Sequence, residues 1–284
     1  MASTKRKVGI VGFGSLGKYL YNAIQTDPVA SAALEVAFVW NRTPSKMEGV
    51  VPEALVCTNL DDFAAFGADV VVEVAHPAIT ASHGPKFIAS ADFFVGSPTA
   101  FADAGIEASV RDAAAASSFG VYVPSGALWG ATDIHKMASR GSLKGLTITM
   151  KKHPSSLKVL GDLVAKLATA AATSDAETVL YDGPVRALCP MAPNNVNTMA
   201  CAALAGHNLG FDRTQARLIA DPRLEAHVID IEVVGPTGPA GTFSVTTQRY
   251  NPAAVGAVTG NATYASFLSS LLAAGGHGPG FHFC

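Results

Sequence analysis

Charged residues are scarce in this sequence, and long apolar runs are missing from it. Only 15% of its 284 residues are charged and its formal net charge is −2, so we expect no general attraction to nucleic acid or to an acidic membrane surface. No window holds about eighteen uninterrupted apolar residues, the length that a membrane-spanning helix needs. The basic start, MASTKRK, is followed only by a short apolar run at residues 8–11, and we therefore expect no signal peptide.

Metal and nucleophile motifs are also missing. The four cysteines, Cys57, Cys189, Cys201 and Cys284, are far apart and form no CxxC pair. We therefore expect reduced thiols in a cytoplasmic protein, with no metal site and no disulfide framework. The sequence holds no HExxH helix, no paired-carboxylate motif and no nucleophile elbow, which disfavours hydrolytic and metal-dependent functions.

The most informative stretch is a glycine-rich turn near the start. An apolar strand at residues 8–11 runs into Gly12, Gly14 and Gly17 at GxGxxG spacing, and a helix follows. In this motif the first glycine allows a tight turn, the second lets backbone approach a pyrophosphate and the third lets the helix pack on the strand. The helix N-terminus adds unpaired N–H groups and a positive dipole end. We predict that residues 12–17 (Gly12, Phe13, Gly14, Ser15, Leu16 and Gly17) bind a dinucleotide.

Further strands follow at regular intervals. Apolar runs at residues 34–42, 68–76, 91–97 and 119–130 alternate with helical stretches, which predicts an α/β fold, a Rossmann-type doubly wound parallel sheet over residues 1–130. The second strand ends at Asn41 and Arg42 with no carboxylate, and Lys46 is nearby. An acidic residue there selects NAD, whereas an arginine accommodates the 2′-phosphate of NADP. The cofactor is therefore NAD or NADP, with the sequence favouring NADP or dual use; the alternative is a solvated basic loop.

The carboxyl ends of the other strands should face the same crevice, because open α/β sheets bind ligands there. We predict that Ala75, His76 and Pro77, then Ser97, and then Ala127 in the Ser125–Gly126–Ala127 turn lie beside the cofactor. For Ser97 alone, an ordinary strand-end hydroxyl is the simpler interpretation.

The pattern changes beyond residue 130. Runs at residues 146–152, 178–181, 228–234 and 242–250 alternate apolar and polar side chains, which predicts an antiparallel sheet with one covered face; residues 235–241 have the composition of a hairpin loop. Helices are expected at 155–172, 194–207 and 214–220. We assign residues 131–250 to an α+β substrate and dimerisation domain and 251–284 to a helix at 253–274 that returns to the first domain, followed by a loose tail. The low charge fraction favours a homodimer.

Four stretches together resemble the L-aspartate dehydrogenase family: GIVGFGSLG, VPSGALWGATD, APNNVNTMA and IADPRLEAHVIDIEV. The resemblance covers most of the chain and implies NAD(P)-dependent oxidative deamination of aspartate to iminosuccinate, then to oxaloacetate and ammonia. It implies that Ala127 and Asn197 contact the cofactor and that His227 is the active-site histidine.

The residues themselves leave several alternatives open. A histidine suits proton transfer near neutral pH, and His227 stands just before a strand in a polar segment; His76, His83, His135 and His153 compete with it. Asn194, Asn195 and Asn197 are suited to capping a helix or binding a ligand. Lys151, Lys152 and Arg213 are the cations considered for substrate carboxylates. A catalytically inactive cofactor-binding protein, or a dehydrogenase of another small acid such as homoserine or a cyclic imine, remains an alternative.

Overall fold

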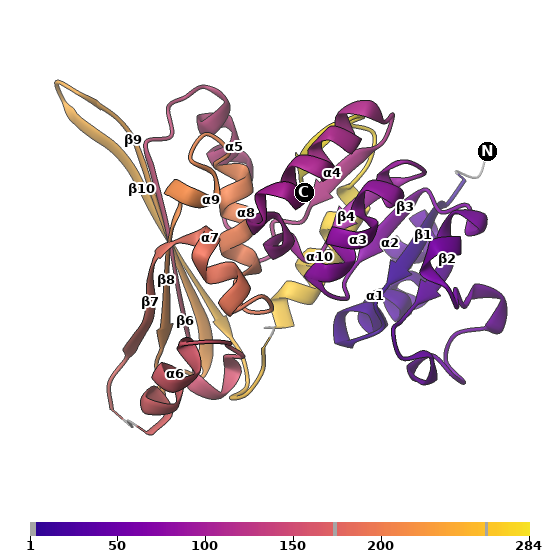
Figure 1. Cartoon of the computed structure of the whole chain (residues 1–284), viewed down its shortest axis with the longest axis horizontal. Coiled ribbons are helices and arrows are strands. Elements are labelled where there is room, and N and C mark those ends of the chain that lie inside the picture. Colours follow the sequence, from indigo (N-terminus) through magenta and orange to yellow (C-terminus); the bar gives the residue numbers. More distant parts are fainter. Residues whose placement is uncertain (1–3, 173–174, 259–260) are drawn as a thin grey trace.

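The computed structural model describes residues 4–172, 175–258 and 261–284, which form two lobes around two separate sheets (Figure 1). The first sheet has the strand order β11-β5-β4-β3-β1-β2, and every neighbouring pair is parallel. Its strands are β1 (Arg6–Val11), β2 (Leu34–Trp40), β3 (Val70–Glu73), β4 (Asp92–Val95), β5 (Gly120–Val123) and β11 (Gly280–Phe283). The strand order reverses between β1 and β3, because β2 lies on one side of β1 and the later strands lie on the other. This reversal creates the switch point where doubly wound folds bind ligands. The predicted Rossmann-type fold is confirmed.

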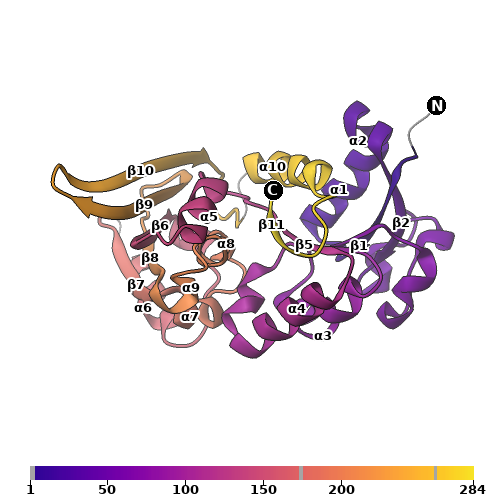
Figure 2. The ribbon, with the colours of Figure 1, turned by 90° about the horizontal axis from the view of Figure 1, so that it is seen from above.

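Helices cover both faces of this sheet (Figure 2). They are α1 (Ser15–Thr26), α2 (Pro28–Ala33), α3 (Pro77–Ile88), α4 (Ala104–Ala116) and α10 (Asn261–Ala273). Alternate strand residues point to opposite faces, so Phe94 packs with Phe267 of α10, whereas Phe93 packs with Phe87 of α3. Burial on both sides explains why these strands are continuously apolar.

The second sheet has the order β10-β9-β6-β8-β7. Its strands are β6 (Gly145–Lys152), β7 (Thr178–Pro184), β8 (Gln215–Ala220), β9 (Ala226–Gly238) and β10 (Gly241–Pro252). The helices of this lobe are α5 (Ala131–Ser139), α6 (Leu163–Ala172), α7 (Val185–Leu188), α8 (Asn197–Ala205) and α9 (Gly210–Arg213). Figure 2 places α6 to α9 on one face of the sheet, and most side chains of the edge strand β10 are exposed.

Two expectations for this lobe are wrong. Residues 214–220 form strand β8 rather than a helix, because QARLIA alternates half-buried and buried side chains and completes the centre of the sheet. The sheet is consequently mixed rather than antiparallel, since β6 and β8 pair in parallel. The boundaries of two helices also move: the helix expected at 155–172 begins only at Leu163, after Gly161 with a positive φ, and α8 is shorter than 194–207.

The C-terminal segment returns to the first lobe, as predicted, although its end is not loose. Helix α10 begins at Asn261 rather than 253; residues 259–260 of the expected helix, like residues 1–3 of the basic start, lie outside the described residues. The last residues form β11, which extends the first sheet beside β5. Phe281 stacks edge-on against Phe101, and this apolar contact explains why a glycine-rich tail is ordered as a strand.

No helix within the described residues is long and apolar enough to cross a membrane.

Candidate functional site

The glycine turn between β1 and α1 has the geometry that a pyrophosphate requires. Gly12 has φ +112°, and a side chain there would lie 2.8 Å from the backbone of Val74. A side chain at Gly17 would come within 2.0 Å of the Gly12 carbonyl oxygen, so this position needs glycine for helix packing. At Gly14 no described atom lies within 4 Å of the position a Cβ would take. Gly14 is also the N-cap of α1, and within the described chain no side chain caps this helix, so its first N–H groups are available to phosphates.

The end of β2 holds the neighbouring loop and exposes two cations. The Asn41 Oδ1 atom accepts a hydrogen bond from the Phe13 amide at 3.0 Å, and the Asn41 side-chain amide donates to the Thr43 carbonyl oxygen. Asn41 thus fixes the glycine turn, while the Phe13 ring is fully buried and its amide is already bonded. Arg42 and Lys46 are exposed at the same edge, where an adenosine ribose with or without a 2′-phosphate would lie.

A buried carboxylate that the sequence analysis missed joins the ends of β3 and β4. Glu73 is fully buried and accepts hydrogen bonds from the backbone amides of Ala75 and His76 at 2.7 and 2.8 Å. It also accepts from the Ser97 amide and hydroxyl and from the Thr80 hydroxyl. Burial raises the Glu73 pKa to about 7, against the opposing effect of these hydrogen bonds. A glutamate inside an otherwise apolar strand was the available signal, because such a group must be paired when buried.

This network gives two predicted cofactor residues a structural task. The Ser97 hydroxyl is committed to Glu73, in keeping with the simpler reading of that residue. The exposed His76 is the N-cap of α3, and its Nδ1 atom accepts a hydrogen bond from the Ala78 amide at 3.1 Å. Ala75 is exposed beside it, at the carboxyl end of β3.

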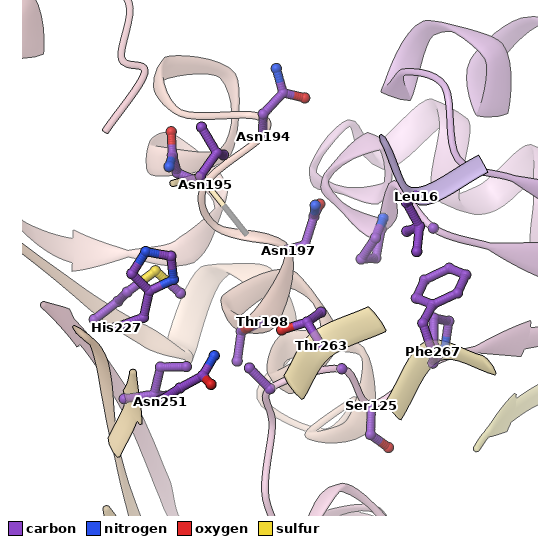
Figure 3. A pocket seen from close by; sticks show the side chains of 18 of the residues that line it. Leu16, Ser125, Asn194, Asn195, Asn197, Thr198, His227, Asn251, Thr263 and Phe267 are labelled. Atoms are coloured by element: carbon purple, nitrogen blue, oxygen red, sulfur yellow. The ribbon is translucent and has the colours of Figure 1, made fainter. Parts of the chain in front are cut away.

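A pocket lies between the two lobes (Figure 3). The first lobe contributes Leu16, the Gly96 and Pro98 strand end, and the turn at Ser125, Gly126 and Ala127. The second lobe contributes polar side chains from β6, β9, β10, α8 and the loop before α8: Lys152, His227, Asn251, Asn194, Asn195, Asn197 and Thr198. Four predicted site residues from distant parts of the chain, Leu16, Ala127, Asn197 and His227, therefore line one pocket. The other predicted cofactor residues lie outside this lining. Most are in the glycine turn or at the ends of β2, β3 and β4, and Pro77 is at the start of α3.

His227 lies near the start of β9 and is 5% exposed. Its Nε2 atom is 2.9 Å from the Ala257 carbonyl oxygen. A carbonyl oxygen only accepts, so Nε2 carries a proton and the neutral ring keeps Nδ1 as its proton acceptor. Burial, together with the positive charge of Lys152, lowers the His227 pKa to about 4. The imidazole is therefore neutral at pH 7 and available as a base.

The structure separates the three candidate cations. Lys152, at the end of β6, lines the pocket, whereas Lys151 points to the other side of the strand and pairs with Glu177 at 3.3 Å. Arg213 ends α9 and donates to the Asn208 carbonyl oxygen. Only Lys152 of these three is part of the pocket lining.

The structure also separates Asn194 and Asn195, in the loop before α8, from Asn197, the first residue of α8. Asn195 is buried and holds the neighbouring loop, because it accepts from the Lys158 amide and donates to the Ser156 carbonyl oxygen. The expectation that one of the amides caps α8 is wrong: the N-cap is Val196, with no capping side chain in the described part of the chain. Asn197 also lines the pocket, and its Oδ1 atom is buried with no hydrogen-bond partner among the described residues. A carboxamide or hydroxyl donor on a bound nicotinamide nucleotide would fit this orphan acceptor.

Comparison with known proteins agrees with this geometry. Residues 133–270 match the family model "Aspartate dehydrogenase, C-terminal", and residues 12–124 match "Homoserine dehydrogenase, NAD binding domain". The "Aspartate dehydrogenase domain-containing protein" of Xenopus tropicalis is 52% identical, with 99% of this chain and 98% of the relative covered. The chain belongs to the aspartate dehydrogenase family.

Members of the aspartate dehydrogenase family from microbes are more distant. The "L-aspartate dehydrogenase" of Brucella anthropi is 31% identical over 81% of this chain and 84% of its own length. The crystal structure of aspartate dehydrogenase from Thermotoga maritima has the same fold, with a TM-score of 0.67, 18% identity, and coverage of 95% of this chain and 94% of that one. Membership in this family and the match of the first domain show that the chain has the fold of an NAD(P)-dependent dehydrogenase and that its cofactor is NAD or NADP.

Proposed function

We propose that this protein oxidises L-aspartate with NAD⁺ or NADP⁺, giving iminosuccinate and, after addition of water, oxaloacetate and ammonia. The reaction balances because the Cα–H bond breaks with its electron pair, the cofactor accepts this hydride, and the amino group leaves as ammonia. The observation that carries the proposal is the position of His227. A buried, neutral imidazole lines the same pocket as Leu16 of the glycine turn and Ala127.

The residues of this chain have separate tasks in the proposed reaction. The glycine turn and the N-terminus of α1 would hold the pyrophosphate, and Ala127 and Asn197 would border the nicotinamide half. The Nδ1 atom of His227 would take a proton from the substrate amine before oxidation or from the water that attacks the imine. Such proton transfer contributes typically about 10²- to 10⁴-fold to a rate.

Turnover of the purified chain tests this proposal. We expect L-aspartate to increase the absorbance of reduced nicotinamide in the presence of either cofactor. His227→Ala should lower kcat by about 10²- to 10⁴-fold without loss of cofactor binding. His153→Asn is the matched control, since His153 caps a short 3-10 helix at residues 154–156 and lies outside the pocket lining; it should keep full activity. A fully active His227→Ala would rule out the assigned role.

We also propose that two copies associate through the exposed edge strand β10 of the second sheet. Between residues 242 and 248 β10 carries no charged side chain, and Phe243, Val245 and Tyr250 are 50%, 41% and 61% exposed. Exposed apolar side chains gathered along one edge strand are typical of an interaction surface. A second copy of this chain supplies a surface of the same uncharged composition. We place the protein in the cytoplasm, in keeping with its four free thiols.

A further inference from the structure

Lys152 is a buried cation with no acidic partner among the described residues. Its side chain lies at the end of β6 and is 5% exposed. Within the described parts of the chain, its ammonium group donates one hydrogen bond, to the Val258 carbonyl oxygen at 3.2 Å. Across residues 4–172, 175–258 and 261–284, no Asp or Glu lies within ion-pair distance of it. Two acidic residues on neighbouring segments are paired with other cations, Glu177 with Lys151 and Asp221 with Arg223.

Such an arrangement is costly unless an anion binds there. A buried charge without a counter-charge loses hydration that a single carbonyl oxygen does not replace. Burial lowers the Lys152 pKa to about 8, so the group still carries its charge at pH 7. This positive charge also contributes to the low pKa of His227. The chain thus keeps a cation next to its proposed base, although an apolar residue would be more stable there.

The position of Lys152 indicates what the anion is. The pyrophosphate would lie at the N-terminus of α1 in the first lobe, whereas Lys152 belongs to the second lobe, on the wall that carries His227 and Asn251. An anion bound by Lys152 would therefore belong to the molecule that reacts beside His227. A carboxylate on the substrate satisfies this requirement, because it pairs with an ammonium through short charge-assisted hydrogen bonds.

We propose that Lys152 binds a carboxylate of the substrate and so restricts the site to small dicarboxylates held next to His227. This inference rests on the proposed function for the location of the reacting carbon. The incoming carboxylate neutralises Lys152 and removes its effect on His227, which makes the imidazole a stronger base when substrate is bound. The side chain of Lys152 thus couples substrate binding to the basicity of His227.

Calorimetric binding of succinate, an unreactive dicarboxylate, to the full chain with NADP⁺ tests the inference. Lys152→Met should weaken succinate binding by about 10- to 100-fold, the effect of losing a hydrogen-bonded charge. Lys151→Met is the matched control, because Lys151 lies on the same strand outside the pocket, and its change should stay below about twofold. Wild-type binding should weaken above about pH 8, as Lys152 loses its proton, and this loss should be absent in Lys152→Met.

Further measurements separate the possible failures. The His227 pKa, followed by NMR, should rise in Lys152→Met. The unfolding temperature of this variant should match or exceed that of the wild type. Lys152→Gln serves if the methionine variant does not fold. Wild-type protein that binds no succinate, or Lys152 variants that bind it unchanged, overturns the inference. If Lys152 governs succinate binding but aspartate is not oxidised, the proposed function fails and the inference stands. If aspartate is oxidised with an unchanged KM in Lys152→Met, the inference fails and the function stands.

Discussion

At the scale of single residues, we propose that the exposed cations after β2 determine which nucleotide binds. Arg42 and Lys46 lie at the edge where the adenosine ribose would be bound, and no carboxylate is present at positions 41–46 to select the 2′-hydroxyl of NAD. We expect Arg42→Ala to weaken NADP⁺ binding by roughly two- to fivefold, the range of a solvent-exposed charge contact, and to leave NAD⁺ binding unchanged. Titration with both nucleotides measures this difference.

Arg140→Ala is the control for Arg42, since Arg140 ends α5 in the second lobe. It should alter neither affinity. Equal weakening of NAD⁺ and NADP⁺ by Arg42→Ala would show that the arginine supports the loop rather than the 2′-phosphate.

The sequence predicted side-chain chemistry better than side-chain environment. The spacing of Gly12 and Gly17 implied close backbone contacts, and both occur. By contrast, Glu73 was hidden inside an apolar run, because nothing local reveals that Ser97 and Thr80 would meet it. The choice among Lys151, Lys152 and Arg213 also needed tertiary structure, since it depends on which strand face is covered.

At the scale of elements, Glu73 fixes the loops that follow β3 and β4. Its folded-state pKa of about 7 lies above the ordinary 4.5, so between these values the folded protein binds more protons than the unfolded chain. The contribution of Glu73 to the free energy of unfolding should therefore decrease as pH rises from about 5 to 7. Denaturation of wild type and Glu73→Gln across this range measures it, because glutamine does not titrate.

The stability difference between wild type and Glu73→Gln should shift toward the variant with rising pH. Parallel stability curves would mean that the carboxylate titrates alike in both states, which the complete burial of Glu73 argues against. Glu73→Ala should be destabilising at every pH, by roughly 1–3 kcal/mol or more, because it leaves buried amide and hydroxyl donors without an acceptor.

Elements in the second half of the chain were harder to predict. The QARLIA segment was read as helix, yet it is the strand β8, because its pairing with β6 and β7 outweighs its local preference. The C-terminal β11 was missed for the same kind of reason. Its order comes from pairing with β5 and from the Phe281–Phe101 contact, neither of which a glycine-rich composition indicates.

At the scale of the whole molecule, the exposed edge strand β10 is the proposed dimer surface. Phe243→Glu would place a charge where the partner copy buries apolar surface, so we expect a shift from dimer to monomer in light scattering. Glu53→Gln, which alters an exposed charge on a short 3-10 helix in the first lobe, should leave the mass unchanged. A wild-type monomer at all concentrations would contradict the proposal, and activity measured on the same samples would show whether association matters for turnover.

The central claim is that the two lobes bring the Cα–H bond of aspartate to the nicotinamide beside His227. Mass spectrometry of the reduced nucleotide, after turnover of aspartate deuterated at Cα, tests it most directly. The account predicts one deuterium transferred to the nicotinamide for each oxaloacetate and ammonia released, with transfer strongly reduced in His227→Ala. Reduced nucleotide without deuterium, or no transfer by wild-type protein that binds both ligands, would contradict it.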